Sequence, residues 1–335
     1  DSLLSNLTKV SCVSKIVLVD DSSEDDTLEK CVSWTHNPGV IAVSAGTPPS
    51  NWGGKSYACY IGASMCEHDW ILFLDADTRM DVDAVGAALG YCSKTGAEAV
   101  SVSPQLVCPG LWDKVATPFY SFLLNSFIKM SDVNSQSKST SYFYGSFMMF
   151  KAESYWRIGG HAAVATDLVE DRALGSLAKR SGLRVGLLRS DGKVRAKWAP
   201  GFRPSFNALV RVTAPSITGR LRVGTAFIFA LSMLFVLPYA GILFLTFSKS
   251  LAAYIAGSTG LLAFMVACAS TALSAKINRV NPILSLLFPV GEMIYLAAMW
   301  VSVFRVKSGK RILWRNRTYV YHGVKLSSER VRRTE

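Results

Sequence analysis

The chain has 335 residues, enough for two domains with a full hydrophobic core. Half of its residues are hydrophobic and its mean hydropathy is +0.26, which is high for a soluble enzyme. The net charge is +12, and neither the seven cysteines nor the four histidines show metal-ligand spacing, which argues against a disulfide framework or a zinc site and favours reduced thiols on a cytosolic face.

The positive charge is concentrated beside the apolar part of the sequence. Residues 172–222 carry 12 basic side chains and 1 acidic one, and residues 305–335 carry 10 and 2, whereas residues 1–85 carry 5 and 13. Basic blocks next to long apolar runs are typical of segments that face anionic lipid headgroups. No nucleic-acid-binding motif accompanies them, so we expect a membrane partner and no nucleic acid.

Strands and helices alternate in the first hundred residues. Short apolar runs predict strands at 16–20, 40–45, 70–75 and 97–104. Helices are predicted between them, after the polar turn DSSEDDT, after the loop GTPPSNWGGKS and over 82–93. This order favours an α/β fold with a mostly parallel sheet covered on both faces.

One strand ends in two closely spaced acids. Residues 71–81 read ILFLDADTRMD, so a buried strand leads directly into Asp75 and Asp77. Ligands of open α/β sheets bind beyond the carboxyl ends of the strands. The alternative is an ordinary loop, since Asp is common in turns.

The middle of the chain adds further predicted elements. An aromatic-rich amphipathic segment covers 111–130, a polar stretch that we expect to be a mobile loop follows at 131–141, and YGSFMMF predicts a strand at 144–150. An acidic helix then contains VEDR, and VGLLRSDGKVRAKW at 185–198 resembles a hairpin. Residues 203–222 place arginines among apolar positions, which is typical of a helix on the membrane surface.

Three long apolar runs follow, at 223–247, 251–274 and 282–304. About 20 such residues span a bilayer, so these are candidate membrane helices, and the alternative is a set of helices buried in a large soluble core. The third run contains Pro289, Gly291 and Glu292. We therefore expect it to be re-entrant or broken, which would return the basic tail to the cytosolic side.

Polar groups follow three of the predicted strands and would meet at one edge of the sheet. They are Asp20 with Asp21, the loop that ends in Lys55, and the pair Asp75 and Asp77. Magnesium takes one or two carboxylates and completes its shell with water and substrate phosphates. The residues therefore indicate a divalent cation and a phosphate-bearing substrate, with Lys55 near the diphosphate.

The motifs VDDSSEDDT, PPSNWGGKSYACYIGA, LDADT, and a later GG followed by ED resemble the family 2 glycosyltransferases with a GT-A fold. The layout is similar to that of membrane-bound lipid glycosyltransferases such as ceramide glucosyltransferase and the hopanoid- and carotenoid-associated enzymes. The tail WRNRTY is similar to the tail of ceramide glucosyltransferases. The resemblance covers about residues 10–210 and this tail.

The resemblance implies a role for each matching residue. Asp20 and Asp21 would contact the nucleoside of a nucleotide-sugar donor and Lys55 would lie near the nucleotide. Asp75 and Asp77 would hold Mg²⁺ or Mn²⁺ on the donor diphosphate. Asp171 would be the general base that activates an acceptor hydroxyl, with inversion at the anomeric carbon. We expect Glu170, beside it, to bind substrate as well.

Several alternatives stay open. Glu170 and Asp171 are also compatible with solvated acids that pair with Arg172 and Lys179, and Asp20 with Asp21 is compatible with a simple turn. The Q/R-x-x-R-W element of many relatives is reduced here to ALVRV, which leaves Arg211 as a candidate diphosphate contact. The family's first strand is also missing before DSLLSNLTKV, so a longer full-length protein is expected.

The sequence thus predicts four regions: a cytosolic GT-A catalytic domain at 1–202, an interfacial amphipathic helix at 203–222, about three membrane segments at 223–306 and a basic tail at 307–335. The predicted function is transfer of a sugar from a nucleotide-sugar donor to a lipid hydroxyl at the cytosolic face of the membrane. The alternatives are a processive polysaccharide synthase, a polyprenyl-phosphate sugar transferase and a membrane-anchored sugar-nucleotide sensor without catalysis.

Overall fold

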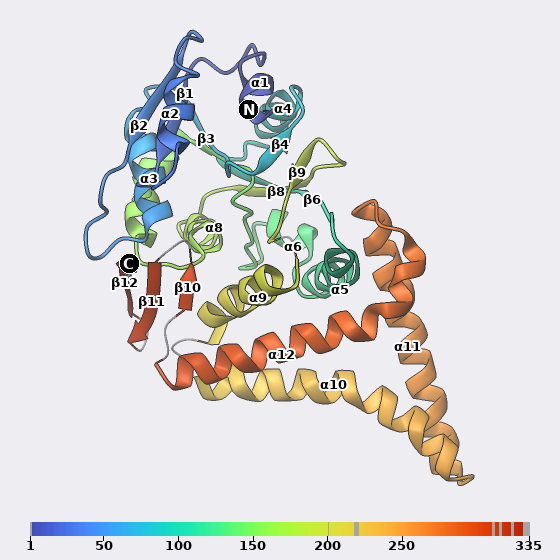
Figure 1. The fold of residues 1–335 in the computed structure, drawn as a ribbon. Coiled ribbons are helices and arrows are strands. Elements are labelled where there is room, and N and C mark those ends of the chain that lie inside the picture. Colours follow the sequence, from blue (N-terminus) through green and yellow to red (C-terminus); the bar gives the residue numbers. More distant parts are fainter. Residues whose placement is uncertain are drawn as a thin grey trace. The chain divides into compact units, whose positions relative to one another are not determined.

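The computed structural model describes residues 2–199, 201–217, 221–309, 312–314, 317–322 and 325–330, with side chains described up to residue 309 except that of Ser216. The chain forms two compact units (Figure 1). The first unit comprises residues 1–105, 128–197 and 313–335, and the second comprises 106–127 and 198–312. The WRNRTY motif falls partly outside the described residues. Arg220, one of the arginines of the 203–222 segment, also lies outside them.

The first unit contains a parallel strand pair near its start. Strand β1 (Ile16–Asp20) pairs in register with β2 (Val40–Ser44). Helices α2 (Thr27–Val32) and α3 (Gly54–Ser64) lie beside this pair (Figure 1). The apolar runs that predicted these two strands are therefore confirmed, and the polar turn after β1 leads into a helix as expected.

A second sheet in this unit has four strands in the order β3 (Trp70–Phe73), β7 (Met148–Lys151), β5 (Ala99–Ser103) and β8 (Val185–Arg189). Strand β8 runs parallel to β5, while β7 is antiparallel to both of its neighbours. The sheet is thus mixed, because a strand from beyond residue 140 inserts between two strands that are closer in sequence. Its side chains Met149 and Phe150 are almost fully buried.

The first unit contains further helices and strands. They are α1 (Ser2–Leu7), β4 (Thr78–Met80), α4 (Ala84–Thr95), α6 (Met130–Asn134), α7 (Ala152–Arg157), the 3₁₀ helix η1 (Gly160–Val164), α8 (Glu170–Arg180), β9 (Val194–Ala196), and the last two C-terminal strands β11 (Arg317–His322) and β12 (Lys325–Arg330), which pair antiparallel. The predicted α/β class with helices flanking the sheets is confirmed.

Two local predictions were wrong. Residues 185–198 do not form a hairpin, because β8 pairs with β5 whereas β9 pairs antiparallel with β4 in another sheet. The polar stretch expected to be a loop begins with helix α6. There the side chain of Asn134 bonds both backbone groups of Leu187, accepting from its N–H at 2.6 Å and donating to its carbonyl at 3.2 Å. An amide side chain thus satisfies two backbone groups of β8, which is the edge strand of this sheet in the described part of the chain.

The second unit is helical. Its elements are α5 (Leu111–Phe127), α9 (Phe202–Ile217), α10 (Leu221–Phe247), α11 (Leu251–Ile277), the 3₁₀ helix η2 (Pro282–Leu287) and α12 (Phe288–Lys307). Strands β6 (Gln105–Leu106) and β10 (Ile312–Trp314) lie at two of the four points where the chain passes from one unit to the other. Three segments are long and apolar enough to cross a membrane: Leu221–Phe247, Leu251–Ile277 and Pro282–Lys307.

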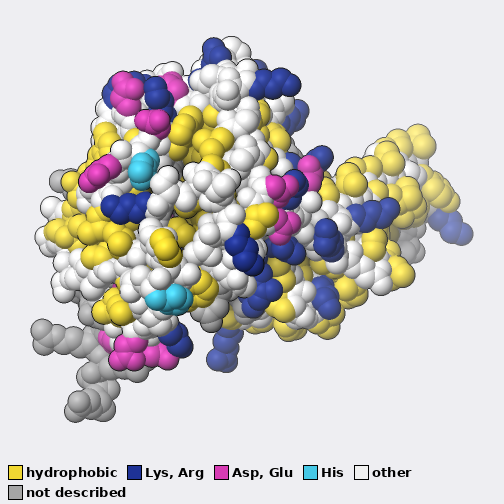
Figure 2. Space-filling model, turned by 90° about the horizontal axis from the view of Figure 1, so that it is seen from above, with side chains coloured by type: hydrophobic (Ala, Val, Ile, Leu, Met, Phe, Trp, Pro, Cys, Tyr) yellow, Lys and Arg dark blue, Asp and Glu magenta, His cyan; other side chains and the backbone are white. Residues whose placement is uncertain are grey.

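Many side chains of these helices are open to the surroundings. Hydrophobic side chains appear across the visible surface, with Lys and Arg among them (Figure 2). In α10 and α11 the exposed ones include Phe247 (81 %) and Leu251 (76 %). Aliphatic and aromatic surface of this kind is unfavourable in water and suits a lipid environment.

Close packing joins the helices of the second unit. A Cβ on Gly260 would lie 2.4 Å from the carbonyl oxygen of Pro238, so α10 and α11 approach each other at backbone distance. Between α10 and α12, the Tyr239 hydroxyl donates to Glu292 at 2.8 Å. Glu292 lies in the first turns of α12, which is continuous from Phe288, so any irregularity in the third apolar segment precedes residue 288.

Candidate active site

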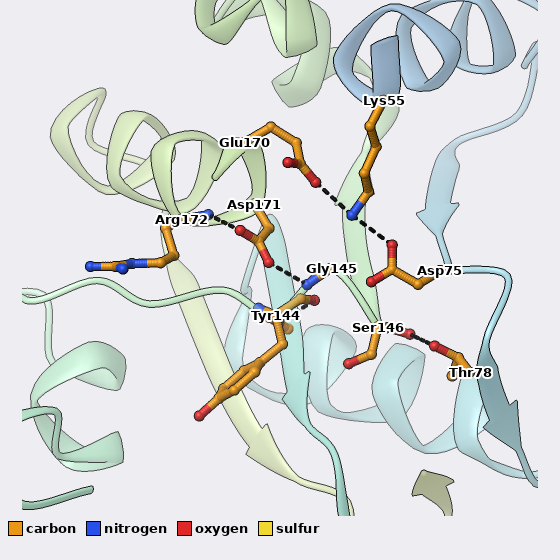
Figure 3. Close-up of polar contacts among 10 residues, drawn as sticks. Lys55, Asp75, Thr78, Tyr144, Gly145, Ser146, Glu170, Asp171 and Arg172 are labelled. Atoms are coloured by element: carbon orange, nitrogen blue, oxygen red, sulfur yellow. Dashed lines mark hydrogen bonds and ion pairs between the residues drawn. The ribbon is translucent and has the colours of Figure 1, made fainter. Parts of the chain in front are cut away.

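A tight turn after β3 presents the first of the two closely spaced acids. The strand ends at Phe73, and the carbonyl of Asp75 accepts the N–H of Thr78 at 3.0 Å, which closes the turn into β4. The Thr78 hydroxyl donates to the carbonyl of Ser146 at 3.3 Å. This bond ties the turn to the segment that precedes β7, so the Asp75 carboxylate is held at a fixed place near residues 144–146 (Figure 3).

A lysine on α3 faces that carboxylate. The Nζ atom of Lys55, the second residue of α3, lies 2.6 Å from Oδ1 of Asp75 and 2.6 Å from Oε1 of Glu170 (Figure 3). The Lys55 side chain is 19 % exposed and that of Glu170 is 4 % exposed. Burial by itself would lower the pKa of Lys55, but the carboxylates of Glu170, Asp75 and Asp171 raise it well above its usual value, so the ammonium stays charged.

Asp171 occupies the first turn of α8, where acidic residues interact favourably with the helix dipole. Its Oδ2 atom accepts the N–H of Gly145 at 2.8 Å and its Oδ1 atom accepts the N–H of Arg172 at 2.7 Å. Burial raises the pKa of Asp171 to about 6, with a further rise from the neighbouring Glu170 and an opposing effect of Lys55. A carboxyl group that titrates close to neutral pH is suited to accept a proton during a reaction.

The three charged groups meet beside a glycine that the sequence did not single out. A Cβ on Gly145 would lie 2.8 Å from Lys55 Nζ, 3.0 Å from Asp75 Oδ2 and 3.2 Å from Asp171 Oδ2. No side chain fits there without moving these groups. The sequence shows only a Gly-Ser pair before an apolar strand. The pair belongs to the site because β7 lies between β3 and β5.

The other predicted residues of this unit have different surroundings. Asp20, at the end of β1, is 4 % exposed, and its two carboxylate oxygens accept the N–H of Ser23 at 3.1 and 3.3 Å. Asp21 follows it and is half-buried, whereas Asp77 is exposed on the turn after β3. Their predicted contacts with a nucleoside and a metal stay predictions. Arg211 lies on α9 of the second unit, and its predicted diphosphate contact also stays a prediction.

The Gly-Gly-His sequence forms a packed corner in the first unit. Gly159 and Gly160 both have positive φ, and a Cβ on Gly160 would collide with the Tyr155 ring at 2.4 Å. The fully buried His161 lies 2.9 Å from the Tyr155 hydroxyl through Nδ1, and burial lowers the pKa of His161 to about 3. These contacts make the motif a tight, packed corner of the fold.

The oxygen atoms after β3 are suitable for a hard divalent cation. In the described residues there is no group of three or more His, Cys, Asp or Glu side chains arranged around one point for a metal. Mg²⁺ does not require such a group, since one or two carboxylates suffice when substrate phosphates complete its shell. Asp75, whose side chain is 27 % exposed, and the exposed Asp77 fit that donor set.

Comparisons with known proteins agree with the motifs. Residues 2–159 match the model of the family "Glycosyl transferase family 2". The chain is 27 % identical over 207 residues to 4,4'-diaponeurosporenoate glycosyltransferase of Staphylococcus haemolyticus, covering 60 % of this chain and 54 % of that protein. It is 26 % identical over 188 residues to the protein of the same name from Staphylococcus aureus strain MRSA252, covering 55 % and 48 %.

The chain therefore spans about half the length of the curated relatives it matches. Among solved structures, S. aureus TarS 1-349 in complex with UDP-GlcNAc is similar over 97 % of this chain and 94 % of that one, at 11 % identity and a TM-score of 0.42. The similarity rests on the family match and the curated relatives, and it agrees with the predicted resemblance: residues 2–159 are similar to the glycosyltransferases of family 2.

Proposed function

We propose that this protein is an inverting glycosyltransferase that moves a sugar from a nucleotide-sugar donor to a hydroxyl group of a membrane lipid. The observation that carries the proposal is the meeting of Asp171, Asp75 and Lys55 beside Gly145. A carboxyl group with a pKa of about 6 lies there next to a carboxylate and an ammonium group. A proton acceptor and the groups that bind a diphosphate are thus close enough to act on one substrate.

Each residue has a distinct part in the proposed reaction. Asp171 accepts the proton of the acceptor hydroxyl, whose oxygen then attacks the anomeric carbon from the face opposite the leaving nucleoside diphosphate. Asp75 and Asp77 would hold Mg²⁺ or Mn²⁺, which when bound supplies charge stabilisation to the donor diphosphate. Lys55 provides a second positive charge, and Asp20 with Asp21 would contact the nucleoside.

A lipid acceptor is supported by the second unit. It contains three helices of membrane-spanning length, preceded by α9 with Arg203 and Arg211. An acceptor that stays in the bilayer requires its enzyme to work at the membrane surface, and we place the catalytic unit at the cytosolic face because basic residues flank the spans. The relatives are named after 4,4'-diaponeurosporenoate, and the ending of that name denotes a carboxylate. An acidic lipid is therefore the second acceptor class.

The proposal is tested with membranes that contain the full-length protein. They are incubated with a panel of labelled sugar nucleotides and with Mg²⁺ or Mn²⁺, and the lipids are then extracted and separated. A labelled lipid supports the proposal, whereas label found only in polymer or in polyprenyl phosphate would favour one of the alternative enzymes. Donor binding without any transfer would indicate a sensor.

The Asp171→Asn variant separates the two acceptor classes. A hydroxyl acceptor needs a base, so transfer should fall while donor binding persists. A carboxylate acceptor is already ionised at neutral pH, and transfer to it should be affected much less. The matched control is Asp167→Asn, which changes an acid just before α8 that has no place in the proposed reaction.

A further inference from the structure

The position of Lys55 has a consequence for metal binding. Its ammonium group lies 2.6 Å from an oxygen of Asp75 and 2.6 Å from an oxygen of Glu170, so it already acts as the counter-charge of the first acid of the Asp-x-Asp pair. A cation coordinated by the same Asp75 carboxylate would lie close to this ammonium and be repelled by it. The two cations cannot both make their best contact with Asp75.

The charges around Gly145 are unbalanced in a way that favours a further cation. Three carboxyl groups, those of Asp75, Glu170 and Asp171, surround one ammonium group. With only Lys55 present, a pyrophosphate would meet excess negative charge. A divalent ion at Asp75 would remove that excess, and it would also release Lys55 from Asp75.

We propose that Lys55 is a built-in competitor of the divalent ion for Asp75, and that Glu170 retains the lysine at the site when the ion displaces it. The inference rests on the proposed function, which assigns the ion to Asp75. Glu170 is nearly fully buried and belongs to α8, whereas Asp75 belongs to the exposed turn after β3. The displaced ammonium therefore keeps one partner and stays where it can meet the donor diphosphate. Glu170 is then a positioning residue and does not bind substrate itself.

The first test is Mn²⁺ binding to the full-length protein in detergent, without donor. Lys55→Met should bind Mn²⁺ about tenfold more tightly than the natural protein, because the ammonium group no longer competes for the Asp75 carboxylate. Lys55→Arg, which keeps the charge, should bind it nearly as the natural protein does. Lys151→Met is the matched control, since Lys151 pairs with Glu153 on the surface at 3.3 Å. Equal or weaker binding by a folded Lys55→Met would overturn the inference.

A double variant separates direct competition from a general effect of charge. Lys55→Met combined with Glu170→Gln has the same net charge as the natural protein, because the buried Glu170 carboxylate is neutralised together with its ammonium partner. Direct competition predicts tighter Mn²⁺ binding, because the Lys55 ammonium still no longer competes for Asp75. If only the net charge of the site matters, the affinity for Mn²⁺ should be unchanged. That result would overturn the proposal. Thermal unfolding of both variants is measured to check that they are folded.

A second readout uses the natural protein alone. Its lysines are modified with an amine-reactive reagent, with and without Mn²⁺, and the extent of modification of Lys55 is measured by mass spectrometry. Release from Asp75 should increase modification of Lys55 and leave Lys151 unchanged; no increase would contradict competition. Asp75→Asn separates the assignment of the ion to Asp75 from the competition by Lys55. If this variant still binds Mn²⁺ normally, the assignment of the ion in the proposed function fails, whereas loss of Mn²⁺ binding with an inert Lys55 defeats only the competition.

Discussion

At the scale of single residues, the site depends on how burial and neighbouring charges change ordinary side chains. Asp171 accepts two backbone N–H groups, which favour its charged form, yet burial and the adjacent Glu170 have the larger effect and raise its pKa to about 6. The same carboxylates keep Lys55 protonated. One residue thus becomes a base near neutral pH while its neighbour stays a fixed positive charge.

The first prediction concerns pH. Below about pH 6 the Asp171 carboxyl is protonated, so transfer to a hydroxyl acceptor should decline as pH falls through this value, and Asp171→Asn should lower kcat by roughly 10²- to 10⁴-fold. The raised pKa also affects stability. Between the ordinary value of 3.8 and about 6 the native state binds more protons than the unfolded state, so the free energy of unfolding should fall as pH rises across this range and then level off.

Rates and thermal unfolding of the natural protein and Asp171→Asn between pH 4 and 8 check both parts. The asparagine variant should lose this contribution to the slope of stability against pH. An acidic limb of the rate profile that persists unchanged in its residual activity would show that another group is responsible.

The second prediction concerns Gly145. An alanine there would press on Lys55, Asp75 and Asp171 at 2.8 to 3.2 Å, so Gly145→Ala should reduce kcat/KM roughly 10²-fold by displacing charged groups. The matched control is Gly90→Ala in α4, where an added Cβ meets nothing within 4 Å and should stabilise the helix by about 1 kcal/mol. Steady-state kinetics with thermal unfolding would show the contrast, and normal activity of Gly145→Ala would contradict the geometry described above.

At the scale of elements, helix starts and strand ends place the functional groups. Lys55 is the second residue of α3, Glu170 and Asp171 open α8, and Asp75 follows β3. In the second unit, α10 and α11 approach each other at backbone distance. Gly260 lies against the carbonyl of Pro238 without an intervening side chain. Small residues at helix crossings are typical of packing within membranes.

The third prediction tests that crossing. Gly260→Val places atoms at 2.4 Å from the Pro238 carbonyl oxygen and should destabilise the second unit by about 1–3 kcal/mol, because α10 and α11 must separate. Thermal unfolding in detergent measures the loss. Leu262→Ala, on a side chain that is 58 % exposed, is the control and should change stability little. Equal effects of the two substitutions would argue against close contact of these helices.

At the scale of the whole molecule, the direction of α12 bears on membrane topology. In the second unit, Leu221 at the start of α10 belongs to the same hydrophobic cluster as Val306 at the end of α12. Further along, Tyr239 of α10 meets Glu292 near the start of α12. The two helices are therefore antiparallel, and the basic ends that contain Arg222 and Arg305 lie together. This arrangement supports the hypothesis that the tail returns to the side from which α10 starts.

The fourth prediction follows from this arrangement. In a variant without other cysteines, Val223→Cys and Ser308→Cys should react with a membrane-impermeant thiol reagent from the same side of the membrane, the cytosolic one. Sealed vesicles of both orientations provide the comparison, and a cysteine in the turn between α10 and α11, such as Lys249→Cys, should react from the opposite side. Labelling of residue 308 from the same side as residue 249 would refute the return of the tail.

The sequence by itself determined the elements and most of the site residues. Apolar runs bounded by breakers identified β1, β2, β3 and β5, because burial of a strand demands such a run, and length with hydropathy identified the three candidate spans. The motifs also singled out Lys55, Asp75 and Asp171, which the structure brings together beside one glycine. Chemical type and local order are properties that a sequence carries directly.

Only the tertiary structure decided which segments became neighbours. The insertion of β7 between β3 and β5 made the sheet mixed and carried Gly145 to the site, and the pairing of β8 with β5 excluded a hairpin. Glu170 became the partner of Lys55 because α8 begins opposite α3, although 115 positions separate the two residues. Such contacts depend on the packing of distant surfaces against one core, and no local pattern in the chain encodes that packing.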